Sequence, residues 1–151
     1  MTTARRHIVI GIVLVVGVIG ASYGIAQLFS SLHLAGTTWE LRHYGDPQHL
    51  TPALAHTRPT LAFGPATLDG WAGCNDFRDG SFLAVGSALW LAPGGITETA
   101  CGSEAEQQPG EIMEQETVYL DLLYQVDTFT RDGDTLTRHT PNGILVFQRR
   151  D

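Results

Sequence analysis

Four dipeptides in which Asp or Asn precedes Gly divide the carboxyl-terminal two thirds of the chain into short runs: Asp69-Gly70, Asp79-Gly80, Asp132-Gly133 and Asn142-Gly143. Such dipeptides readily adopt the positive φ angles of tight hairpin turns, and each lies between apolar runs of β type. This punctuation predicts antiparallel strands joined by short turns. The predicted strands cover residues 36–41, 60–63, 66–68, 71–75, 81–91, 126–131, 135–139 and 144–149.

One segment departs from this rhythm. Ile112, Glu116, Tyr119 and Leu123 follow one another at helical spacing, which predicts an amphipathic helix over residues 111–124. Residues 46–59 contain three prolines and two histidines without periodicity, so we expect a loop there. The sequence therefore predicts a mainly β domain with one helix, and its length suffices for one compact core.

The amino-terminal segment is of a different kind. Residues 8–29 contain no charged side chain, and that length spans the hydrocarbon core of a bilayer. Arg5 and Arg6 precede it and an acidic domain follows, so the positive-inside rule places residues 1–7 in the cytoplasm. We expect an anchor or uncleaved signal over 8–29, a linker over 30–35 and an exported domain over 36–150. The alternative is signal cleavage after Gly24-Ile25-Ala26, which would release a secreted or periplasmic protein.

The charge of the domain argues against one class of partner, and its cysteine content permits one disulfide. From Glu40 onward the chain has seven arginines against sixteen carboxylates, which argues against nucleic-acid binding. The only two cysteines, Cys74 and Cys101, lie in the part expected to be exported, where one disulfide can form.

No set of residues has the chemistry and spacing of an active site. Neither cysteine has a histidine partner nearby in the sequence, so a structural role is favoured over a nucleophile. His43, Asp46, His49 and His56 have separations that fit neither a helix face nor a zinc hairpin, so we expect no metal. We also expect no cofactor and no enzymatic activity. Trp39, Trp71 and Trp90 are expected in the core or at its rim, because an exposed aromatic patch would instead mark a partner surface.

Residues spread over the whole exported part resemble the META domain family, which includes HslJ-type bacterial envelope proteins. The motif residues that carry the resemblance are Gly36, Thr37, Trp39, Gly70, Gly73, Cys74, Asn75, Phe77, Gly80, Thr97, Ala100, Cys101 and Glu116. Thr99 stands where the family usually has methionine. The resemblance implies a small closed antiparallel β-barrel with one or two helices, and the family has no established catalytic residues.

These observations lead to a functional expectation. We expect a non-enzymatic, extracytoplasmic structural or binding module of the bacterial cell envelope, with a link to stress, held in the membrane by a single helix. Its partner would be an unknown envelope protein or a small ligand. One alternative is a carrier that holds a small apolar ligand in the barrel. A hydrolase with an unrecognised site is the least favoured alternative.

Overall fold

The computed structural model describes residues 34–92, 94–99, 109–125 and 127–150. Within these ranges the chain forms a sheet of ten strands and one helix, α2. Their bounds are β1 Thr37–Asp46, β2 His49–Pro52, β3 Thr60–Phe63, β4 Thr67–Trp71, β5 Asp76–Val85, β6 Ala88–Ala92, β7 Gly95–Ile96, α2 Pro109–Leu123, β8 Asp127–Asp132, β9 Thr135–Thr140 and β10 Gly143–Arg150.

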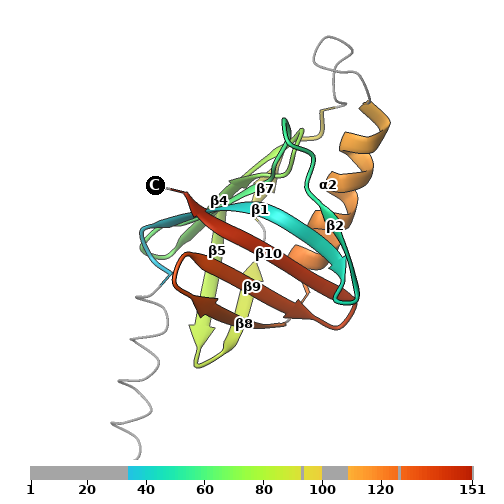
Figure 1. Ribbon diagram of the computed structural model, residues 1–151. Coiled ribbons are helices and arrows are strands. Elements are labelled where there is room, and N and C mark those ends of the chain that lie inside the picture. The colour runs from blue at the N-terminus through green and yellow to red at the C-terminus, as the bar shows by residue number, and fades with distance from the viewer. Residues whose placement is uncertain (1–33, 93, 100–108, 126, 151) are drawn as a thin grey trace, which may run out of the picture.

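Eight of these strands close into an antiparallel barrel (Figure 1). The order around the barrel is β1-β3-β4-β5-β6-β8-β9-β10, and β10 pairs with β1 to complete the circle. β2 adds to β1 and β7 adds to β5 outside that circle. Closure pairs the outer strands with each other and so removes the exposed edges of an open sheet.

The barrel core follows from the alternation of side chains along each strand. On β1 the inward positions hold Trp39 and Leu41, and on β10 they hold Leu145 and Phe147, all fully buried. The expected shared face of Trp39 and Leu41 is confirmed. Because large side chains occupy these positions on several strands, the interior is a packed core.

Helix α2 contributes its apolar face to the same core. The Tyr119 ring meets Phe147 of β10 edge to face, and its hydroxyl donates to the Thr60 carbonyl of β3 at 3.3 Å. At the end of the helix, the buried guanidinium of Arg138 on β9 donates to the Leu123 carbonyl at 2.8 Å. A cation at this position stabilises the negative end of the helix dipole. The helix is thus tied to strands from several parts of the barrel.

The two ends of the barrel differ in what they carry. The described chain begins at Leu34, at the end of the barrel that also holds the β3–β4, β5–β6 and β8–β9 turns. The β4–β5 and β9–β10 turns lie at the opposite end. Figure 1 shows the first described residues toward the lower side of the view and the start of α2 at the upper side. A site near the β4–β5 turn therefore faces away from the point where the chain enters the domain.

The mainly β fold, the barrel and the helix are confirmed, but two of the predicted turns are wrong. Asp69-Gly70 lies inside β4. Asp79-Gly80 lies inside β5, because Asp79, with a positive φ of 58°, forms a bulge and the strand continues beyond it. The predicted strand over 81–91 is instead a hairpin that turns at Gly86, whose φ is 60°. The predicted loop over 46–59 contains the short strand β2.

The predicted anchor over 8–29 lies outside the described residues. Within the ranges that the structure describes, no helix has the length and apolar character needed to cross a membrane.

Candidate functional site

Five residues of the family motif meet at the turn between β4 and β5: Gly73, Cys74, Asn75, Thr97 and Glu116. The buried carboxylate of Glu116, on α2, accepts the amide protons of Cys74 at 3.0 Å and Asn75 at 2.8 Å. Its other oxygen accepts Asn75 Nδ2 at 2.6 Å. Gly73 has a φ of 120°, a conformation that side-chain-bearing residues rarely adopt, which explains glycine at this position. The helix therefore holds the turn through one carboxylate.

The side chain of Asn75 extends this network to the segment after β7. Its Oδ1 accepts the Thr99 amide at 2.7 Å and the Thr97 hydroxyl at 3.0 Å, while its Nδ2 also lies 3.1 Å from the Thr99 carbonyl. The Thr97 hydroxyl oxygen in turn accepts the Asp76 amide at 3.0 Å. Because Asn75 is only 4 % exposed, these bonds replace those that water would make. We call Cys74, Asn75, Thr97, Thr99 and Glu116 the turn network.

A second side chain of α2 fixes a second loop. Gln115, adjacent to Glu116 and 1 % exposed, accepts the Leu54 amide at 2.7 Å and donates to the Thr57 carbonyl at 2.9 Å. This bond pair joins the helix to the loop between β2 and β3. Helical periodicity in the sequence places Gln115 with the polar side chains opposite the apolar face, and its burial in the structure corrects that expectation.

The remaining motif residues are placed separately. Thr37 and Trp39 lie at the opposite end of the barrel, where the Trp39 indole donates to the Thr37 hydroxyl at 2.7 Å. Gly70 is pressed between the Phe77 ring and the Thr60 carbonyl, so a methyl group there would overlap both. Gly80 lies within the strand pairings of β5. Thr37, Trp39 and Gly80 lie outside the turn network and serve packing, whereas Gly70 lies on β4 beside it.

Of the predicted disulfide, Cys74 is described and Cys101 lies outside the described residues. The motif residue Ala100 also lies outside them. Cys74 Sγ lies 3.4 Å from the carbonyl oxygen of Thr99, two positions before Cys101 in the sequence. The turn network therefore brings the segment leading to Cys101 next to Cys74. The Cys74–Cys101 pairing itself stays a prediction.

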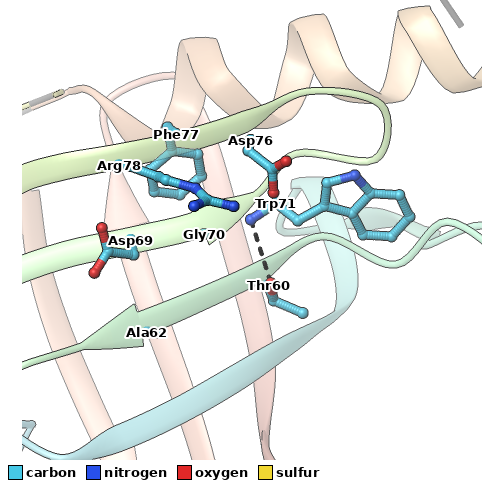
Figure 2. A pocket seen from close by; sticks show the side chains of 8 residues that line it. All are labelled: Thr60, Ala62, Asp69, Gly70, Trp71, Asp76, Phe77 and Arg78. Atoms are coloured by element: carbon cyan, nitrogen blue, oxygen red, sulfur yellow. Dashed lines mark hydrogen bonds between the residues drawn. The ribbon is translucent and has the colours of Figure 1, made fainter. Parts of the chain in front are cut away.

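A hollow of about 410 Å³ lies on the outer surface of the barrel beside the turn network. We call it the β3–β5 hollow; its lining residues are Thr60, Ala62, Asp69, Gly70, Trp71, Asp76, Phe77 and Arg78. Figure 2 shows the Arg78 guanidinium over Gly70, with Asp69 to one side and Asp76 to the other. The indole of Trp71 lies beyond Asp76.

Two features of the backbone shape this hollow. Trp71 and Asp76 pair across the strands and flank the turn, so the turn network positions both of them. The bulge in β5 sets Asp79 opposite Asp69, whose Oδ1 accepts the Asp79 amide at 3.0 Å. Bulges commonly redirect side chains next to functional sites. Here the bulge follows Arg78 directly and places its side chain between two carboxylates.

The charged groups of the hollow remain available to a ligand. Within the part of the chain that the structure describes, Asp76 and Arg78 make no side-chain hydrogen bond or ion pair. The hollow therefore offers a guanidinium donor, carboxylate acceptors and an aromatic surface in one place. The sequence analysis missed this set, because only the strand register and the bulge bring Trp71, Asp76 and Arg78 together.

Metal-ligating and titratable side chains can be compared with this hollow within the residues that the structure describes. In the described ranges, no three His, Cys, Asp or Glu side chains come together in a way that could hold a metal ion. The pKa is raised for three tyrosines, chiefly because burial disfavours the charged phenolate: Tyr44, Tyr119 and Tyr124. Tyr119 belongs to the core, and none of the three lines the β3–β5 hollow.

Comparison with known proteins agrees with this fold. An NMR structure of a protein from Burkholderia xenovorans is similar with a TM-score of 0.61 and 21% identity, covering 80% of this chain and 86% of that chain. A second NMR structure has a TM-score of 0.52 and 18% identity, covering 78% and 92%. No curated protein sequence matches the chain. The META domain family model matches residues 32–151, and the chain therefore belongs to the META domain family.

Proposed function

We propose that this protein is a non-enzymatic binding module of the bacterial cell envelope, held by its amino-terminal helix, that takes a polar ligand in the β3–β5 hollow. The observation that carries the proposal is that two kinds of side chain lie next to each other at the β4–β5 turn. The motif residues are occupied by internal hydrogen bonds, whereas Trp71, Asp76 and Arg78 beside them face outward. In this proposal the motif residues hold the turn in place, and the residues of the hollow contact the ligand.

The turn network is a poor starting point for catalysis. Glu116 accepts three N–H donors and is 5 % exposed, so its oxygens are shielded from a substrate. Asn75 uses both ends of its amide within the protein. A hydrolase would need an accessible acid or base at hydrogen-bonding distance from its substrate. These contacts favour a binding module over the hydrolase alternative.

The chemistry of the hollow suits a ligand that combines hydroxyl groups with an apolar face. Hydroxyl groups both donate to carboxylates such as Asp76 and accept from a guanidinium such as Arg78. The Trp71 indole offers a flat apolar surface and one N–H donor. A saccharide ring has both properties, and the size of the hollow falls within the usual range for small-molecule sites, about 300–1,000 Å³. We therefore propose a saccharide as the ligand.

The barrel interior is less suited to the alternative role as an apolar carrier. The inward positions hold Trp39, Phe63, Phe77 and Phe147, and the Tyr119 ring from α2 packs against them. A ligand would have to displace these side chains, whereas ligand sites are usually formed before binding. The outer hollow needs no such rearrangement.

A titration of the full-length protein in detergent micelles with the trisaccharide of N-acetylglucosamine tests the proposal. The amide and indole N–H signals are followed by NMR. We expect the Trp71 indole and the Asp76 and Arg78 amides to shift, and Trp71→Ala to abolish the effect. Trp90→Ala, which changes an exposed tryptophan outside the hollow, is the matched control and should bind normally. Shifts that survive Trp71→Ala would place the binding site elsewhere.

A further inference from the structure

We propose that the outer face of the β5–β6 hairpin lies against the bilayer surface beside the anchor. This inference rests on the proposed membrane attachment but does not involve the β3–β5 hollow. It assigns a partner, the interfacial region of a lipid bilayer, to the most exposed apolar surface of the described domain.

The hairpin is unusual in composition. Residues 81–92 contain no charged side chain in a chain that is otherwise acidic. Leu83 is 57 % exposed and Trp90 39 %, and the two are direct partners across β5 and β6. An exposed pair of large apolar side chains on one sheet face marks an interaction surface.

The strand register places the turn of this hairpin at the end of the barrel where the described chain begins. The row of partners that starts at Thr37 passes through Phe63 and Leu68 and reaches β5 at Gly80. β5 continues past this row to Val85 before it turns back. Leu83 and Trp90 therefore lie on the two strand segments that lead into and out of this turn.

The connection to the predicted anchor is short enough to keep this end of the barrel near the membrane. The uncharged segment ends at Phe29, and Leu34 is already in a turn whose carbonyl accepts the Thr37 amide at 3.1 Å. Residues 30–33 span at most about 14 Å when fully extended. An anchor that ends at Phe29 would therefore hold this end of the barrel, and the hairpin turn with it, close to the bilayer surface.

The side chains fit that location. Tryptophan is enriched at membrane interfaces, where an apolar ring and a polar N–H both find suitable surroundings, and leucine adds apolar area. The same end of the barrel carries exposed Arg149 and Arg150 as well as Asp132 and Asp134, so opposite charges balance there. The exposed charges therefore neither attract nor repel this end of the barrel, and the apolar side chains of the hairpin provide the attraction to the bilayer.

A second copy of the chain is a weaker occupant for this face. Stable interfaces use about 20–30 residues on each side, whereas the described hairpin exposes two large apolar side chains. A bilayer requires no matching surface, and the linker holds the hairpin close to it. We therefore commit to the bilayer and leave self-association as an outcome of the test.

The test uses the full-length protein in phosphatidylcholine vesicles with and without brominated acyl chains, which quench nearby tryptophan fluorescence. We expect quenching in the parent protein, loss of most of that quenching in Trp90→Phe, and retention in the matched control Trp71→Phe. Unchanged quenching in Trp90→Phe would overturn the inference. So would protection of Trp90 from both brominated lipid and aqueous acrylamide, which would indicate a protein interface instead.

Vesicle flotation separates the two proposals. Protein that floats with the vesicles but shows no quenching of Trp90 retains the anchor and refutes only the hairpin contact. Protein that does not float refutes the anchor, and the hairpin contact with it.

Discussion

Asn75 and Glu116, 41 positions apart in the sequence, are joined by a hydrogen bond of 2.6 Å from the amide nitrogen to the carboxylate. The bond connects the β4–β5 turn to helix α2 in the interior of the protein. Through Asn75 it also reaches Thr97 and Thr99, in the segment that precedes the helix. One side-chain pair therefore links three parts of the family motif.

Removal of the Glu116 carboxylate should destabilise the domain strongly. Glu116→Ala leaves the Cys74 and Asn75 amides and Asn75 Nδ2 without their acceptor in a buried site, and each unsatisfied donor costs about 1–3 kcal/mol. We expect a loss of about 3 kcal/mol in the free energy of unfolding, measured by urea denaturation. Glu114→Ala, an exposed position on the same helix, should change it by less than about 0.5 kcal/mol. Equal effects of the two variants would show that the turn network contributes little.

Docking of α2 depends on its buried apolar face. Leu123 is fully buried in the core cluster, so Leu123→Ala should cost about 2–5 kcal/mol. Met113→Ala, at a position that is 38 % exposed, should cost less than about 1 kcal/mol. Thermal unfolding of the two variants under the same conditions checks the difference. If the Leu123 variant unfolds like the parent, the helix is peripheral to the fold.

Tyr119 should make the protein sensitive to alkaline conditions. Burial raises its pKa above the ordinary value of about 10, so the folded state holds the phenolic proton more tightly than the unfolded state does. This contribution is fully present below about pH 10 and is lost as the pH rises further, because only the unfolded chain then ionises. Tyr119→Phe should cost about 1 kcal/mol at pH 8 through loss of the bond to the Thr60 carbonyl.

The diagnostic quantity is the stability difference between the parent and Tyr119→Phe as a function of pH. We expect this difference to shrink between pH 8 and pH 11, because the variant lacks the ionising group. A difference that stays constant across this range would show that Tyr119 does not cause the alkaline loss. Tyr44→Phe, at a half-buried position, provides a comparison with a smaller expected effect.

The predicted disulfide has a direct chemical test. Non-reducing peptide mapping of protein produced by export should recover Cys74 and Cys101 in one linked fragment. Closure of the loop between them should stabilise the domain by about 3.5 kcal/mol in the chain-entropy description, and reduction should remove that amount. Recovery of both cysteines as alkylatable thiols in the folded domain would rule the bridge out.

The elements that the sequence predicted well are those with a local physical signal. The helix over 111–124 was found from its periodicity, and the turns at Asp132-Gly133 and Asn142-Gly143 were found from their composition. Asp79-Gly80 carries the same composition but lies in a bulge, because pairing with β4 on one side and β6 and β7 on the other keeps the strand continuous. Long-range pairing overrides local turn propensity at that position.

The candidate site was less accessible to prediction. Motif residues such as Asn75 and Glu116 were identified, but their mutual contact depends on how the helix docks on the barrel. The β3–β5 hollow depends on strand register and on one bulge, neither of which has a signal in a single sequence. The exposure of Trp90 likewise depends on the hairpin turn at Gly86, where the sequence predicts one continuous strand.

Retention of residues 8–29 is the central claim of the functional account, because both the envelope location and the hairpin contact depend on it. Mass spectrometry of protein extracted from membranes tests it most directly. We predict recovery of peptides from residues 8–26 in the mature protein. A mature amino terminus at Gln27 would show that the segment is a cleaved signal and would contradict the account.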